Sequence, residues 1–165
     1  MARVSYRRAF PLVLLPFILL VPFPIAPVPL VSGLRSVDLA GLDLTTMRAF
    51  ETNFFCESAW CVAAGTSLRF DLVERRLETF GFGFSQDPWR GVDCLSESWS
   101  TLEPEMPTTA VIIWGFILCH LADSDEPAKQ WGLFRLSVVA DPETGRVFEG
   151  ALEASWRGRL ELSVR

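Results

Sequence analysis

The C-terminal third of the chain alternates between apolar and polar residues, and this pattern constrains the fold more than any other feature. The even-numbered apolar positions are Phe134, Leu136, Val138, Ala140, Phe148, Leu152, Ala154, Trp156, Leu160, Leu162 and Val164. Charged and hydroxyl side chains occupy most of the odd positions from residue 149 onward. Because a period of two places alternate side chains on opposite faces of a strand, this region predicts antiparallel strands with one face in water.

Residues 141–145, with the sequence DPETG, predict the turn of a hairpin. Pro142 presets a type I turn, and Gly145 supplies the left-handed residue of a bulged loop. A loop of odd length keeps even-numbered positions on one face of both strands. A two-residue turn at Gly158 would break this parity, so we expect either a long strand kinked at Gly158 or a three-residue loop centred on it.

Two further strands are predicted upstream of this hairpin turn. Residues 109–121 are apolar on both faces and rich in β-branched side chains, which is typical of a strand buried at the centre of a sheet. Residues 131–140 predict the next strand. Residues 85–108 show no period and are rich in Ser, Pro and Glu, so we interpret them as a long connection.

The first half of the domain predicts helices. Apolar residues spaced by three and four predict a helix over residues 45–63; these residues are Met47, Phe50, Phe54 and Cys61. Residues 67–80 fit a helix or a strand, and we favour the helix because no turn-forming residue lies near Arg75 and Arg76. Residues 80–84 predict a short strand with three Phe rings on one face. The predicted class is α+β, with N-terminal helices packed on a C-terminal antiparallel meander; the alternative is a mostly β sandwich or barrel.

The start of the chain predicts export. Residues 9–34 contain no charged side chain, and Arg3, Arg7 and Arg8 precede them, as in a segment that engages a translocation machine. The stretch is long enough to span a bilayer, but its six prolines make a poor transmembrane helix. We therefore interpret residues 1–33 as a signal peptide or membrane-anchoring leader, and residues 34–165 as a single α+β domain.

The leader predicts a secreted or extracytoplasmic protein. The preferred interpretation is a signal peptide cleaved after Gly33, where small residues gather. One alternative is a membrane-associated protein anchored by residues 9–31, and another is a proline-rich tail that does neither.

Four cysteines, Cys56, Cys61, Cys94 and Cys119, are disulfide candidates. An even count in an exported chain favours bridges, here with three connectivities open, and we expect at least one, with Cys94 pinning the 85–108 connection. The alternative is that some are small buried apolar residues. Their irregular spacing around a single His argues against a metal site, and we expect no metal or other cofactor.

The charge balance excludes some partners. The whole chain has a formal net charge of −5, and residues 34–165 carry −8 because three arginines and no acidic residue precede them. An acidic domain does not bind nucleic acid by counterion release, and it contacts an anionic membrane only through its basic leader.

Two function classes remain. Trp89 and Trp99 lie in the predicted connection, where flat rings can stack on a sugar or anchor a partner. They predict an exported, non-catalytic binding module with residues 85–108 as its contact surface, for a protein, a glycan or an apolar small molecule. The alternative is a small hydrolase or transferase in which His120 is the general base, oriented by Asp123 or Asp125.

Overall fold

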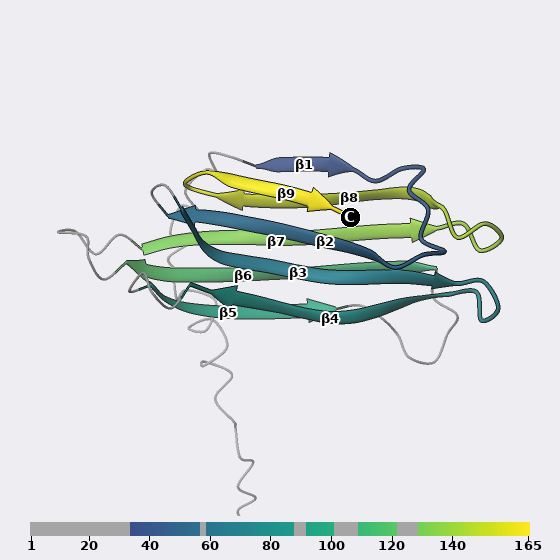
Figure 1. The fold of residues 1–165 in the computed structure, drawn as a ribbon, viewed down its shortest axis with the longest axis horizontal. Helices are drawn as coiled ribbons and strands as arrows, with labels where there is room; N and C mark the ends of the chain where they lie inside the picture. The colour runs from purple at the N-terminus through teal and green to yellow at the C-terminus, as the bar shows by residue number, and fades with distance from the viewer. Residues whose placement is uncertain (1–33, 57–58, 88–91, 101–108, 122–128) are drawn as a thin grey trace, which may run out of the picture. The chain divides into compact units, whose positions relative to one another are not determined.

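The computed structural model describes residues 34–56, 59–87, 92–100, 109–121 and 129–165. These described residues form nine strands and no helix (Figure 1). The strands are β1 (Arg35–Asp38), β2 (Arg48–Cys56), β3 (Ala59–Asp71), β4 (Arg76–Gln86), β5 (Val92–Ser100), β6 (Ala110–Leu121), β7 (Lys129–Ala140), β8 (Val147–Trp156) and β9 (Leu160–Val164). The predicted leader, including its cleavage site, lies outside the described residues.

The strands form two antiparallel sheets. The five-stranded sheet has the order β1-β8-β7-β6-β5, and the four-stranded sheet has the order β4-β3-β2-β9. Figure 1 shows them as two overlapping layers. The α+β prediction is wrong, because the N-terminal half forms strands of the second layer where helices were expected. The architecture agrees with the alternative of a mostly β sandwich.

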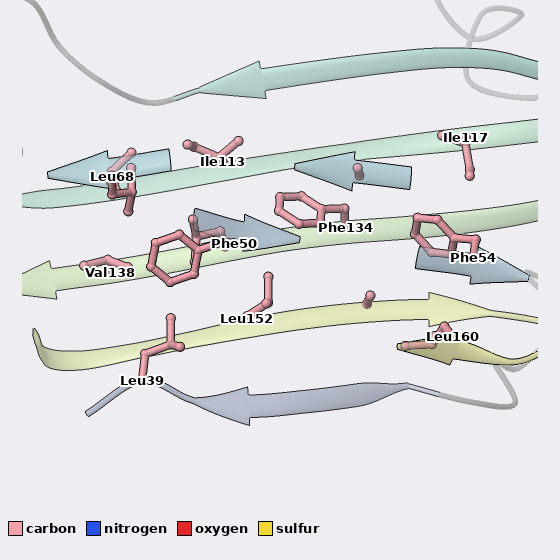
Figure 2. Packing of buried hydrophobic residues seen from close by; sticks show 14 of the residues in the cluster. Leu39, Phe50, Phe54, Leu68, Ile113, Ile117, Phe134, Val138, Leu152 and Leu160 are labelled. Carbon is pink, nitrogen blue, oxygen red and sulfur yellow. The ribbon is translucent and has the colours of Figure 1, made fainter. Parts of the chain in front are cut away.

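The hydrophobic core lies between the two sheets (Figure 2). The Phe54 ring of β2 lies 5.2 Å from the Trp156 ring of β8, and the Phe82 ring of β4 lies 5.3 Å from the Phe134 ring of β7. The indole Nε1 of Trp156 also donates a hydrogen bond to the backbone oxygen of Phe55, at 2.9 Å. Aromatic side chains of both layers therefore join the sheets face to face.

The helix predicted over residues 45–63 is wrong. Phe50, Thr52, Phe54 and Cys56 are all buried on one side of β2, whereas Met47, expected in the core, is 52% exposed. In the four-stranded sheet β2 lies between β3 and β9 and pairs with both of them. Pairing on both edges with one face buried favours the period-two arrangement over the helical one.

The helix favoured over residues 67–80 is also wrong, because the chain turns between β3 and β4. The Oδ1 atom of Asp71 accepts hydrogen bonds from the backbone N–H groups of Val73 at 2.8 Å and Glu74 at 3.0 Å. Arg75 adopts a left-handed φ of 50°. The turn-forming residue that the prediction missed is Asp71, whose side chain binds the backbone of the turn.

The three Phe rings of residues 80–84 do not share one face. The pairing of β3 with β4 shifts register between Gly65 and Ser67, and Gly81 in the opposite strand has a φ of +54°. Beyond this bulge Phe82 and Phe84 pack against the core, whereas Phe80 is 39% exposed on the outside.

Strands β6 and β7 lie where the sequence predicts strands, and the turn that follows β7 is confirmed. Asp141 accepts a hydrogen bond from the backbone N–H of Glu143 at 2.7 Å, and Gly145 has a φ of +68°. Parity holds through β7 and the second half of β8, but Phe148 is 78% exposed because the register shifts beside it.

The three-residue connection expected around Gly158 is confirmed, since β8 ends at Trp156 and β9 begins at Leu160. The continuous meander is wrong, because β9 pairs with β2 in the four-stranded sheet. The short loop thus carries the chain from one layer to the other.

The long connection over residues 85–108 is wrong in its middle part. Residues 92–100 form β5, which pairs with β6 without a break in register and makes one edge of the five-stranded sheet. Residues 88–91 and 101–108 lie outside the described residues. Within the described part of the chain, no helix is long and apolar enough to cross a membrane.

Candidate binding surface

Strand β6 is apolar on both of its faces, and the structure buries only one of them. Odd-numbered side chains such as Ile113 and Ile117 lie in the core, at 1% and 0% exposure. Even-numbered side chains such as Trp114 and Leu118 face outward, at 41% and 39% exposure. The sequence predicts a strand buried on both sides, but no strand of the described residues covers the outward side.

Neighbouring strands extend this apolar surface. We call it the aromatic face; it consists of Leu95 and Trp99 on β5, Ile112, Trp114, Phe116 and Leu118 on β6, and Trp131, Leu133 and Val139 on β7. Seven of these nine side chains are between 38% and 62% exposed. Since a large apolar side chain offers about 150–250 Å², the face leaves on the order of 600 Å² of apolar surface in water.

Three rings at the centre of the aromatic face stack on one another. Trp99 lies directly opposite Trp114 in the β5–β6 register, with ring centroids 4.4 Å apart and planes inclined by 28°. The Phe116 ring follows at 5.9 Å from Trp99. The stacked cluster is therefore preformed, and its rings have little conformational entropy left to lose on binding.

The structure places Trp99 on a strand rather than in a loop. Its ring is 42% exposed, but it reaches the surface as part of β5 and beside Trp114, a residue of the strand predicted to be buried. Trp89 lies outside the described residues. The role of Trp99 in binding stays a prediction, and the cluster around it was missed.

The edge strand β5 has the reverse polarity of an ordinary sandwich strand. Leu95 and Trp99 point outward, whereas Ser96 and Ser98 share the inward side with Cys94 and are exposed. A half-buried strand normally turns its apolar side chains to the core and its polar ones to water. The outer side of β5 thus carries Leu95 and Trp99 alternating with the acidic residues Asp93 and Glu97.

The cysteine prediction is confirmed, because the chain forms the disulfides Cys56–Cys61 and Cys94–Cys119. The second bridge involves Cys94, as expected, but it joins directly opposed residues of β5 and β6 where a bridge to a long loop was predicted. Among the described residues, no group of three or more His, Cys, Asp and Glu side chains could hold a metal ion.

A shallow hollow of about 320 Å³ lies at the end of the aromatic face, and its lining residues are Asp93, Cys94, Leu95, Leu118, Cys119 and His120. His120 is directly opposite Asp93 in the register. Asp123 and Asp125, expected to orient His120, lie outside the described residues. Because both sulfur atoms of the hollow belong to the disulfide, these cysteines offer no thiol nucleophile beside His120.

The outer face of the four-stranded sheet is polar. Its ion pairs include Arg69 with Glu78, at 2.6 Å, and Arg165 with Glu51, at 3.5 Å. The guanidinium of Arg69 also lies 5.7 Å from the centroid of the Phe80 ring. Aromatic surface on this side is thus partly covered by charged side chains of the same chain.

Comparison with known proteins gives no match to a family model, to a curated protein or to a solved structure. Functional inference therefore depends on the chemistry of this surface.

Proposed function

We propose that this protein is an exported, non-catalytic interaction module that binds its partner through the aromatic face. The observation that carries the proposal is the stacked cluster of Trp99, Trp114 and Phe116 within about 600 Å² of outward apolar surface. The largest apolar patch of a typical monomer is about 300–600 Å² and is often functional. Trp is one of the residues that most often contribute a large share of the binding energy at protein interfaces.

Export is supported by the chemistry of the chain. The two disulfides fit an oxidising compartment, and the apolar leader with its preceding arginines fits a translocated protein. The proposed location is secreted or extracytoplasmic, with anchoring through residues 9–31 as the alternative.

A protein is the partner that this surface favours over a glycan or an apolar small molecule. Small-molecule sites are concave and enclose most of the ligand, whereas the aromatic face is the outer surface of a sheet. The acidic charge of residues 34–165 argues against nucleic acid.

The alternative function, a small hydrolase or transferase with His120 as general base, has one observation in its favour. Asp93 lies opposite His120 beside the hollow. A carboxylate that orients an imidazole is one part of a nucleophilic site, but the disulfide occupies the two cysteines that would complete it. The aromatic face is the stronger basis for a function.

Site-specific photocrosslinking tests the proposed function. A benzophenone amino acid replaces Leu118 on the aromatic face or, as a matched control, Phe80 on the opposite sheet; both side chains are 39% exposed. The full chain is irradiated in the compartment to which it is exported. We expect a crosslinked adduct from position 118 and none from position 80. Equal adduct from both positions, or none from position 118, would contradict the proposal.

A further inference from the structure

We infer that the partner of the aromatic face is a second copy of this chain, and that the face is the interface of a symmetric dimer. This inference rests on the proposed function and names its partner. It is argued from the size of the face and from the distribution of charge around it.

The size of the aromatic face suits an interface between two proteins. A stable complex of standard size buries about 800 Å² on each partner, of which somewhat more than half is apolar. The face offers on the order of 600 Å² of apolar surface, so a border of polar side chains completes the required area. Homodimer interfaces are the more apolar class, which agrees with this proportion.

The charges bordering the face are arranged asymmetrically. Glu97 lies on β5 between Leu95 and Trp99, and it takes part in no ion pair with another described residue. Arg135 lies on the opposite side, on β7, as the cross-strand neighbour of Trp114. Its side chain is 54% exposed although it lies 3.3 Å from Glu153. The β5 border is therefore acidic, whereas the β7 border carries Arg135 beside Glu153, with β6 between the two borders.

A twofold axis that runs along β6 in the plane of the face uses this asymmetry. It places β5 of each copy over β7 of the other, so that each Glu97 approaches the partner's Arg135 while the Trp114 rings lie near the axis. A twofold axis running across the strands would instead place β5 over β5 and β7 over β7, so that Glu97 of one copy would not meet Arg135 of the other. In a twofold interface every contact occurs twice, so each favourable pair counts double.

A membrane surface fits the same face less well. Glu97 lies within the apolar area and Asp93 at its end, and residues 34–165 carry a formal charge of −8. An anionic leaflet would repel these carboxylates, and a neutral leaflet would have to accept Glu97 near its apolar boundary.

The test begins with the mass of the full chain, purified from the compartment to which it is exported, by sedimentation equilibrium over a range of concentrations. We expect twice the mass of one chain. Trp114→Glu should give a folded monomer, because it places two carboxylates near the axis. Trp60→Glu is the matched control, with the same substitution at a side chain 40% exposed on the opposite sheet, and it should leave the dimer intact. Leu118→Glu is a second variant of the aromatic face if Trp114→Glu does not fold.

Two charge reversals test the direction of the axis. Glu97→Arg alone and Arg135→Glu alone should each weaken the dimer at least tenfold, because like charges then face each other at both contacts. Mixed in equal amounts, the two variants should form a heterodimer, since each arginine then meets a glutamate of the other copy.

Several results would overturn the dimer. These are a monomer at every concentration, a dimer that Trp114→Glu and Leu118→Glu leave intact, a dimer lost in Trp60→Glu, or charge variants that do not associate when mixed. A monomer that still crosslinks to another exported protein from position 118, or that binds phosphatidylcholine vesicles through the face, overturns the dimer alone. A monomer with no adduct specific to position 118 overturns the proposed function as well.

Discussion

The two outer faces of the sandwich differ although one rule of strand geometry builds both. On the four-stranded sheet, outward side chains pair with one another, as Arg69 does with Glu78, and a guanidinium lies near the Phe80 ring. On the five-stranded sheet, by contrast, the outward rings of Trp99 and Trp114 stack on each other. The alternation of side chains along a strand determines which of them face outward. The chemistry of those outward side chains then determines whether the face is suited to contact with water.

The largest effect should come from the core that both faces share. Trp156 is 1% exposed and contacts Phe54 of the other sheet, so Trp156→Ala should lower the free energy of unfolding by about 3–5 kcal/mol. Trp60→Ala, on the polar face, should change it by no more than about 0.5 kcal/mol. Urea unfolding of both variants measures the difference. Similar losses would mean that Trp60 is not at a water-facing surface.

The two disulfides, one in each sheet, should differ in how much they stabilise the fold. Cys94–Cys119 in the five-stranded sheet closes a loop of 25 residues, and Cys56–Cys61 in the four-stranded sheet closes one of 5. Chain entropy predicts that replacing the first pair by Ser costs about 3.5 kcal/mol and replacing the second about 2 kcal/mol. Denaturant midpoints of the two double variants give the order, and the reverse order would contradict the loop-length argument.

Gly132 faces the core and Gly65 faces outward, so the same Gly→Ala substitution should cost different amounts of stability at the two positions. A methyl group at Gly132 on β7 would lie 2.8 Å from the Trp156 ring and 3.0 Å from the backbone oxygen of Ser155. At Gly65 on the outer side of β3 its nearest neighbour would be the backbone oxygen of Phe50, at 3.5 Å. Gly132→Ala should therefore cost about 1–3 kcal/mol, and Gly65→Ala much less. Thermal melting measures both, and a Gly132→Ala protein as stable as the parent would contradict the tight packing.

The smallest effect concerns the β3–β4 turn of the four-stranded sheet. Backbone hydrogen bonds from Glu74 and Val73 hold the pKa of the Asp71 carboxyl below its ordinary value of 3.8. A carboxyl whose pKa is lower in the folded than in the unfolded state stabilises the fold at pH values above its unfolded-state pKa. This contribution is lost as the pH falls through the folded-state pKa. Asp71→Asn keeps an acceptor oxygen without titrating, so its melting temperature should fall less between pH 6 and pH 3. An identical pH response of the two proteins would exclude this role.

Local chemistry was sufficient to predict the last hairpin. Pro142 and Gly145 fix the turn, Asp141 stabilises it, and strict alternation fixes the buried side of β7. Each of these signals lies within a few residues of the structure that it determines.

The strands of the N-terminal half could not be read in the same way. Phe50 and Phe54 are four residues apart, and this spacing places them on one face of a helix and also on one face of a strand. Thr52 lies between them in the chain, on the same face in a strand but on the opposite face in a helix. The structure buries Thr52 beside both Phe residues, with no hydrogen-bond partner for its hydroxyl among the described residues, but a polar residue at this position does not predict burial from the sequence. The pairing of β9 with β2 is a tertiary choice that alternation alone does not encode.

The candidate surface was present in the sequence in another form. Residues 109–121 were apolar on both faces, and this pattern was interpreted as burial within one domain. The structure leaves the outward half exposed, because β6 has only β5 and β7 beside it and no layer of described residues over it. The pattern predicts that both faces of β6 are buried, but it does not show whether the residues that bury the outward face belong to the same chain.

Hydroxyl-radical footprinting tests this covering most directly. The oxidation rates of Trp99, Trp114 and Trp60, which are 40–42% exposed in one chain, are measured by mass spectrometry at protein concentrations above and below the association midpoint. We predict that Trp99 and Trp114 become protected at high concentration while Trp60 reacts at a constant rate. Equal reactivity of all three at every concentration would contradict a covered aromatic face.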